Sequence, residues 1–214
     1  MFARRWFVLT LCAMTPLRRF VTGTLFAAAL AITVVGAQGC GYNGLVSADE
    51  QVKASWAQVE NAYQRRADLI PNLVSTVKGS AQHEEKVLTE ITAARASATQ
   101  VKLEPGDLSD PAKLAAFEAA QSKLSGALGR LLVVSENYPD LKANAAFRDL
   151  QVQLEGTENR ISVERRRYNE SVQAYNTECR SFPTVVVAKI AGFKPKEPFH
   201  ATATNADKPP EVKF

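Results

Sequence analysis

The residues best suited to chemistry lie in one charged stretch, residues 65–88, which combines arginines, an aspartate and a histidine beside a glutamate. His83-Glu84 begins like the His-Glu-x-x-His motif of metalloproteases, in which two histidines four residues apart reach one zinc ion from the same face of a helix. Position 87 is Val87, and the second histidine of the chain is His200, near the C-terminus. The spacing therefore argues against a zinc site, and His83 is interpreted as an exposed residue on a charged helix.

The sequence offers no complete set of residues for another familiar catalytic mechanism. Metal-bridged helical bundles use Glu-x-x-His on two helices, but that spacing occurs here from Glu197 to His200, contains Pro198 and lies in the tail. No glycine-rich phosphate loop and no Gly-x-Ser-x-Gly turn is found. Cys179 has no histidine near it in sequence and is interpreted as a packing residue. We therefore predict a non-enzymatic protein with no catalytic residue, metal or cofactor.

Polar residues inside the apolar pattern are more informative candidates. Four polar residues occupy positions where apolar residues are expected: Arg66, Ser80, Glu84 and Glu164. A buried polar group at such a position fixes which helices pair and in which register. We predict a structural or interaction role for them; rim side chains whose charged ends reach water are the alternative. An enzyme that uses Arg65 and Arg66 with Asp68 stays as a rival hypothesis.

The elements that position these residues are helices. From about residue 43 to residue 99, apolar or aromatic residues recur at seven-residue steps in two interleaved series, which is typical of a helix packed against others. Pro71 lies inside this stretch, where a proline removes a backbone hydrogen bond at a cost of about 3 kcal/mol. Because the heptad phase is the same on both sides of Pro71, the sequence favours one kinked helix over two helices with a turn near Asp68.

Two further helices are predicted after this stretch. The second follows the turn at Pro105-Gly106, begins at Asp110-Pro111 with a capping residue and a proline in the first turn, and stops near residue 137. The third runs from about residue 141 to residue 180, and a short apolar segment at 182–193 is expected to cover the rest of the first helix. Short connections make neighbouring helices antiparallel. The predicted fold is all-α: an antiparallel bundle of three long helices plus a short C-terminal helix.

The C-terminal residues, a search for repeats and the net charge give no further candidate site. The proline-containing residues after 193 are expected to be extended or disordered, with a flexible tail at 200–214. No repeat of 20–50 residues appears, and three Tyr-Asn pairs are too short to define one. The net charge of +4 comes from four arginines within residues 1–39, where no acidic residue occurs, so the rest of the chain is balanced. A nucleic-acid partner, which needs a basic face, is not expected.

The N-terminal residues 1–39 are predicted to be a signal peptide or a transmembrane anchor preceding a bundle domain at 40–199. Arg18-Arg19 precede an apolar centre, Leu25–Val35, and small residues lead to Cys40, an order that resembles a bacterial lipoprotein signal with Cys40 as the lipidated residue. An uncleaved anchor is the alternative, because residues 20–39 approach the roughly 20 apolar residues that span a bilayer. Both alternatives tether the protein and place its body on the extracytoplasmic, periplasmic side.

Several long stretches resemble LemA-family bacterial proteins: YNGLVSADEQVKASWAQVENAYQRRADLIPNLV from residue 42, SENYPDLKANAAFRDLQVQLEGTENRISVERRRYNESVQAYN at 135–176, and FPTVVVAKIAGFKPKEPF from residue 182. The resemblance implies a membrane-anchored helical bundle without a known catalytic activity. It also implies a role in envelope assembly, by analogy with members from bacterial organelle membranes. The resemblance also implies a structural or interaction role for the residues that match the family's RRxDLIPNLV stretch, which are Arg65, Arg66, Asp68, Pro71 and Asn72.

The function that these observations favour is a membrane-anchored, non-enzymatic helical scaffold or adaptor of the bacterial cell envelope. Its expected partners are the membrane, through the N-terminal anchor, and an envelope protein or a second copy of the chain. The alternatives are an enzyme with a site at the Arg65–Asp68 kink and a protein that remodels membranes through an amphipathic helix. The balanced charge of the body argues against the last.

Overall fold

The structure is a computed structural model that describes residues 16–80 and 85–200, with side chains described from residue 41 onward except at Ser80. This described part contains helices and no strand, which confirms the all-α prediction. The elements in chain order are α1 (Pro16–Ser80), α2 (Glu85–Gln100), a short 3-10 helix η1 (Asp107–Ser109), α3 (Pro111–Ser135), α4 (Pro139–Ala143), α5 (Ala145–Arg180) and α6 (Thr184–Ala191).

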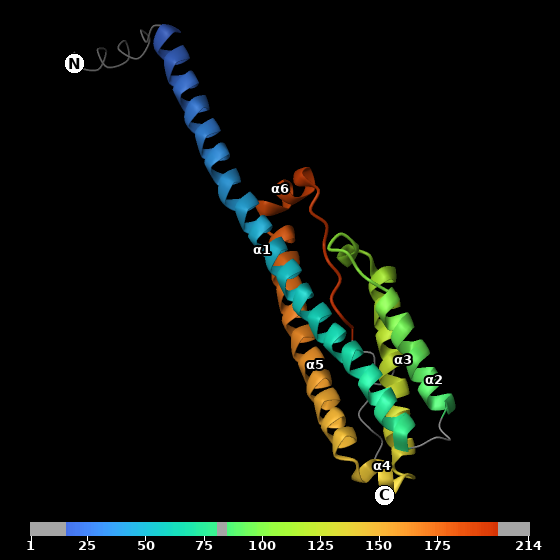
Figure 1. The fold of residues 1–214 in the computed structure, drawn as a ribbon. Helices are drawn as coiled ribbons and strands as arrows, with labels where there is room; N and C mark the ends of the chain where they lie inside the picture. Colours follow the sequence, from blue (N-terminus) through green and yellow to red (C-terminus); the bar gives the residue numbers. More distant parts are fainter. Residues whose placement is uncertain (1–15, 81–84, 201–214) are drawn as a thin grey trace, which may run out of the picture.

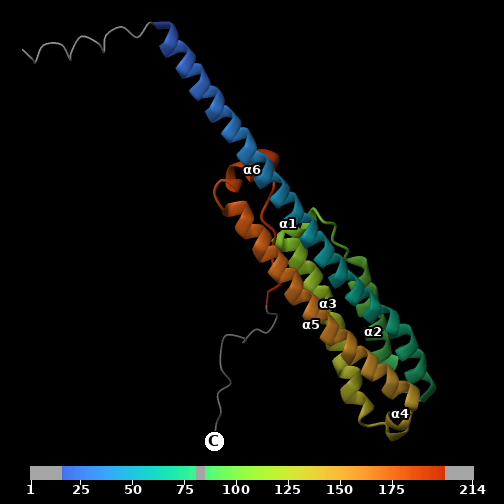
Figure 2. The same ribbon diagram turned by 90° about the vertical axis from the view of Figure 1, so that its left-hand side faces the viewer.

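Four of these helices form an antiparallel bundle (Figures 1 and 2). α5 runs back along α1, and α2 pairs with α3, so that the two pairs face each other. α4 closes the end of the bundle where α5 begins, and α6 lies at the opposite end beside α1. Beyond α6 the N-terminal part of α1 projects from the bundle as a single helix.

The first predicted helix is two helices, which corrects the expectation of one helix over residues 43–99. α1 ends at Ser80, and α2 begins at Glu85 and returns along the bundle. Both helices bury the predicted heptad positions, for example Val77 in α1 and Ile91 in α2. A seven-residue pattern shows which face of a helix is buried but not the direction in which the chain runs. The unchanged heptad phase therefore could not predict that the chain reverses between α1 and α2.

α1 continues through Pro71, and the helix interruption considered near Asp68 does not occur. Pro71 has no N–H to donate to the carbonyl of Ala67, four residues earlier. The Nε of Arg95 on α2 donates to that carbonyl instead, at 2.8 Å. The proline therefore leaves an acceptor that the neighbouring helix uses.

Local sequence sets the start of α3 as expected and that of α5 differently. The Asp110 side chain accepts the backbone N–H groups of Ala112 and Lys113, which confirms the predicted cap. α5 begins at Ala145 and not near residue 141, because Asn144 caps it and residues 139–143 form the separate α4.

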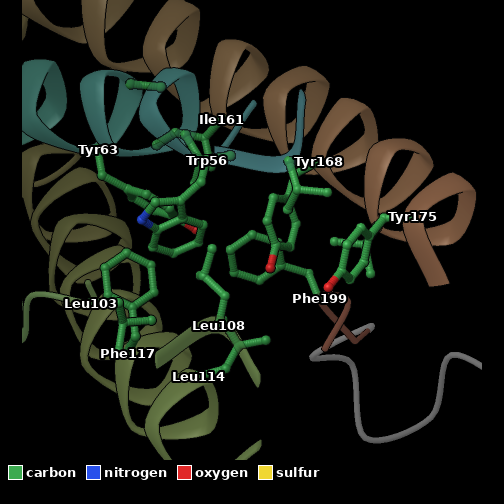
Figure 3. Close-up of a cluster of buried hydrophobic side chains, with 14 of the residues drawn as sticks. Trp56, Tyr63, Leu103, Leu108, Leu114, Phe117, Ile161, Tyr168, Tyr175 and Phe199 are labelled. Carbon is green, nitrogen blue, oxygen red and sulfur yellow. The ribbon is translucent and has the colours of Figure 1, made fainter. Parts of the chain in front are cut away.

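The core consists of two clusters along the bundle. The cluster nearer α6 is aromatic: the Trp56 ring lies edge-on to Phe117 and Tyr168 and stacks on Phe199, with ring centroids 5.4–5.8 Å apart (Figure 3). The cluster nearer α4 is mainly aliphatic. Its most deeply buried members include Ile70, Leu73, Ile91, Leu124, Leu131 and Phe147.

The short apolar segment covers the α6 end of α1, as predicted. Ala188 of α6 is buried in the aromatic cluster, and a Cβ atom on Gly41 of α1 would lie 3.1 Å from the Thr184 side chain. The connection between α2 and α3 contributes Leu103 and Leu108 to the same cluster, which the sequence pattern did not indicate.

Candidate functional site

Arg66 is the centre of a buried polar cluster at the level between the two core clusters. Its side chain is only 2% exposed. Nη1 donates to Ser125 Oγ at 2.7 Å and to Glu158 Oε2 at 2.8 Å, and Nη2 donates to Gln121 Oε1 at 2.7 Å. Gln121 in turn donates to the carbonyl of Ala98 at 3.2 Å. One guanidinium group thus joins α1 to α3 and α5 directly and reaches α2 through Gln121.

The structure separates Arg66 from the two residues considered with it. Arg65 and Asp68 are exposed and line an open, polar groove between α1 and α5, together with Gln153 and Arg160. Asp68 Oδ1 accepts from Gln64 Nε2 at 2.7 Å on the same helix. Since successive residues of a helix are about 100° apart, neighbours in sequence lie on different faces. The Arg65–Asp68 stretch is therefore not assembled into one site with Arg66.

The other predicted site residues have different surroundings. Pro71 and Asn72 are exposed on α1, and the carbonyl of Asn72 accepts from the hydroxyls of Ser75 and Thr76 at 2.9 Å. Glu164 is 2% exposed.

Glu164 forms ion pairs with two arginines of its own helix. Arg160 Nε lies 2.8 Å from Glu164 Oε1, and Arg167 Nη1 lies 3.2 Å from the same oxygen. Glu84 lies outside the described residues, as does the side chain of Cys40.

A pocket of about 280 Å³ opens between α3 and α5 beside Arg66. Among the described residues, no Cα atom of α3 lies within 8 Å of one of α5, so the two helices are far enough apart to leave room for this pocket. The pocket walls are largely aliphatic, and Glu155 and Glu158 stand among the lining residues as carboxylates. The aliphatic lining residues are Leu73, Leu128, Leu131, Leu132 and Leu154. Arg66 also lines the pocket and is already paired with Glu158, so this arrangement suits an apolar side chain.

Residues 194–200, the C-terminal strap, occupy the other part of the space between α3 and α5 (Figure 1). They form no helix, and Lys196 and Phe199 are buried. Asn176 Oδ1 accepts the N–H of Lys196 at 2.9 Å, and its Nδ2 donates to the carbonyl of the same residue at 2.7 Å. Asn169 binds both backbone groups of Phe199 in the same way, at 2.8 and 3.0 Å. The strap is therefore held through its backbone.

The spacing of the Asn169 and Asn176 contacts follows from the rise per residue of the α5 helix and of the extended strap. Asn169 and Asn176 are seven residues apart on α5, about 10.5 Å along a helix. Phe199 and Lys196 are three residues apart, about 10 Å in an extended chain. The strap therefore runs antiparallel to α5 in register with its heptads.

Two tyrosines of α5, also seven residues apart, bind the backbone of the strap as well. Tyr175 donates its hydroxyl to the carbonyl of Lys194, and Tyr168 donates to that of Glu197, both at 3.0 Å. Burial raises the pKa of both phenols and so keeps them protonated as donors. Sequence analysis missed this binding surface, although the Tyr-Asn pairs seven residues apart were its signal.

The ionisable groups of the described residues include no group of three or more His, Cys, Asp or Glu side chains placed to hold a metal ion. Burial raises the pKa of the Cys179 thiol, which makes it a poor nucleophile. Across residues 41–79 and 85–200, whose side chains the structure describes, no helix is long and apolar enough to span a membrane. The predicted membrane segment, residues 20–39, is part of α1 but lies outside that range of described side chains.

The fold and the buried polar cluster define an all-α bundle with one extended first helix. A family model for the LemA family matches residues 55–214, three quarters of the chain, and the protein belongs to this family. That finding confirms the resemblance drawn from its sequence motifs.

Two similar proteins are named after magnetosomes. The chain is 28% identical over 175 residues to magnetosome protein MamQ of Magnetospirillum gryphiswaldense, and 29% identical over 174 residues to magnetosome protein MamQ 2 of Paramagnetospirillum magneticum. Each match covers 74% of this chain and 64% of the relative. Protein LemA of Metamycoplasma hominis is 23% identical over 147 residues, covering 69% of this chain and 63% of the relative. The chain thus spans less than two thirds of the length of these relatives.

Proposed function

We propose that this protein is a membrane-anchored, non-enzymatic adaptor of the bacterial cell envelope. The observation that carries the proposal is the continuity of α1, which runs from Pro16 to Ser80 without a break. The predicted membrane segment at 20–39 and the first helix of the bundle are parts of one helix. A continuous helix transmits the position of an anchor to the body, which a flexible linker does not do. Relatives named magnetosome proteins support a role at a bacterial membrane structure.

The adaptor role rests on the space between α3 and α5. The strap fills one part of it, and the pocket beside Leu128 and Leu132 leaves an apolar surface for a partner's side chain. The non-enzymatic part of the proposal is supported by Arg66, whose two terminal nitrogens donate to Ser125, Glu158 and Gln121 within the bundle. These are the contacts of a residue that joins helices.

The anchor is tested by the intact mass of the protein purified from membranes, wild type beside Cys40→Ala. A mature chain that begins at Cys40 with added acyl mass, lost in the variant, would establish a lipoprotein. An unmodified chain that retains residues 20–39 would establish a transmembrane anchor. A chain that lacks residues 20–39 and carries no acyl group would overturn the proposal.

The adaptor role is tested by photo-cross-linking in native membranes. A photoreactive amino acid replaces Leu132, at the pocket, or Glu170, an exposed residue of the same bundle on α5, as the control. A single cross-linked partner from position 132 that is absent from position 170 is expected. Equal products from both positions, or none from either, would contradict an adaptor surface at the pocket.

A further inference from the structure

The outer face of α6 is apolar and uncovered. Phe182 is 87% exposed, Val186 51% and Ile190 83%. Val186 and Ile190 are four residues apart and share one face of α6, and Phe182 lies in the turn that precedes the helix. Ala188, which is buried, lies on the opposite face, because two residues correspond to about 200° of rotation. α6 therefore packs on the bundle with one side and presents an apolar stripe with the other.

α6 itself lies where α1 leaves the bundle (Figures 1 and 2). Gly41 of α1 lies against Thr184 of α6, and residue 41 follows the predicted membrane segment at 20–39 after a single residue. Tyr42 is 47% exposed, and its ring meets the edge of Phe193 with centroids 6.0 Å apart. Aromatic residues at this position relative to an apolar segment are typical of the membrane–water interface.

Basic residues surround the stripe. Arg180, Lys189 and Lys194 are all exposed. Lys189 lies within α6 beside Ile190, and the other two flank the helix. The nearest acidic residue in sequence, Glu178, is half-buried and its carboxylate is directed toward Gly44 of α1. An apolar face with basic flanks fits an anionic lipid surface, which accepts apolar side chains below its charged headgroups.

We propose that α6 lies in the interface of the membrane that anchors α1, with Phe182, Val186 and Ile190 inserted between lipid headgroups. This inference rests on the proposed membrane anchor. The bundle then has two attachments to the membrane, the anchor and α6, and two attachments fix its orientation. The pocket between α3 and α5, which lies toward α4, is held away from the lipid surface.

Site-specific fluorescence on the full chain tests this placement. Cys12 and Cys40 are replaced by serine so that neither reacts with the label. The change at position 40 also removes the predicted lipidation site, so residues 20–39 stay attached. Cys179 is buried and does not react with the label. An environment-sensitive NBD label is placed by Ile190→Cys or, as a matched control, by Val152→Cys. Val152 is 67% exposed and lies about two turns from the start of α5, which directly follows α4. The protein is reconstituted in vesicles of phosphatidylcholine and phosphatidylglycerol, with or without a lipid that carries a doxyl quencher near its headgroup.

The expected result is a blue-shifted, doxyl-quenched label with Ile190→Cys and a water-like, unquenched label with Val152→Cys. Adding Lys189→Glu and Arg180→Glu, or omitting phosphatidylglycerol, should reduce the quenching of the Ile190→Cys label toward that of the control. If both labels report water while the chain floats with the vesicles, the α6 placement is overturned and the anchor stands. A chain that does not float refutes the anchor and the placement together. A blue-shifted label that the doxyl lipid does not quench, and whose shift grows with protein concentration, would show that the stripe packs against a second copy of the chain. That result would overturn the membrane placement.

Discussion

Arg95 Nε on α2 lies 2.8 Å from the carbonyl oxygen of Ala67 on α1, the oxygen that Pro71 leaves without its helical donor. A proline inside a helix usually weakens it by removing this hydrogen bond. Here the free carbonyl becomes a specific acceptor for the neighbouring helix, which fixes the position of α2 along α1. The proline therefore contributes to the pairing of two helices and does not divide one of them.

Replacing Arg95 and Pro71 singly and together should show this coupling. Arg95→Ala should lower the free energy of unfolding by about 1.5–3 kcal/mol, the range for hydrogen bonds from charged donors. In a Pro71→Ala background the loss should be smaller, because the N–H of residue 71 then binds the carbonyl of Ala67. Urea unfolding of the four proteins measures the difference. Equal losses in both backgrounds would show that Arg95 acts independently of the proline.

The strap should depend on the amide groups that hold it. Asp in place of Asn169 or Asn176 still accepts a backbone N–H but cannot donate to the carbonyl, so each bidentate contact becomes one bond and one repulsion. We expect Asn169→Asp and Asn176→Asp to speed amide exchange at residues 196–199 and tryptic cleavage after Lys196, with the double variant showing the largest effect. Asn61→Asp, on an exposed position of α1, is the matched control. An unchanged exchange rate in the double variant would mean that burial of Phe199 holds the strap alone.

Helix content could be predicted from this sequence, but chain reversal and the strap could not. Heptads such as Val52 and Val59 mark buried faces, and Asp110 marks a helix start, because these signals are local. The change of chain direction between α1 and α2 does not alter the heptad pattern, so the pattern cannot predict it. The strap follows no periodic pattern in its own sequence, and the Tyr-Asn spacing on α5 that matches it does not identify the segment that it binds.

The candidate site shows the same limit. Arg66 could be expected inside the bundle from its heptad position, and the structure buries it. The structure does not bring Arg66 together with Arg65 and Asp68, the three residues of the rival enzyme hypothesis, because Arg66 is buried and the other two are exposed. On a helix, residues three, four or seven apart share a face, and adjacent residues do not. Its partners Ser125 and Glu158 are 59 and 92 residues away, and no local pattern identifies them.

Arg66 should be essential to stability, and its neighbour should not be. Arg66→Ala leaves the buried Gln121 without its donor, whereas Glu158, whose side chain is 54% exposed, can bind water instead, so we expect a loss of about 1.5–3 kcal/mol in the free energy of unfolding. Arg66→Lys should not restore it, since one ammonium group cannot reproduce the planar fork of contacts. Arg65→Ala, at an exposed position, should change stability by less than about 0.5 kcal/mol. Thermal and urea unfolding distinguish these cases; a stable Arg66→Lys variant would mean that charge alone is required.

Asp49 makes the attachment of the strap sensitive to acid. Its carboxylate lies 2.8 Å from Lys53 Nζ and 2.9 Å from Lys196 Nζ of the strap, and its side chain is 15% exposed. Burial opposes ionisation, but the hydrogen bonds from Lys53 and Lys196 outweigh it, so the pKa of Asp49 is lowered. The unfolded chain therefore binds this proton more tightly than the folded chain does.

The sign of the effect follows from that difference. A carboxyl whose pKa is lowered on folding contributes stability that is fully present above its ordinary pKa of about 3.9 and is lost as the pH falls through the folded value. Wild type should exceed Asp49→Asn in unfolding free energy by about 1–3 kcal/mol at neutral pH. The difference should start to shrink as the pH falls below about 4 and should vanish only below the lowered folded pKa of Asp49, where both side chains are uncharged. Urea unfolding across this range measures the gap, and a gap that stays constant with pH would mean that Asp49 acts by packing and not by its charge.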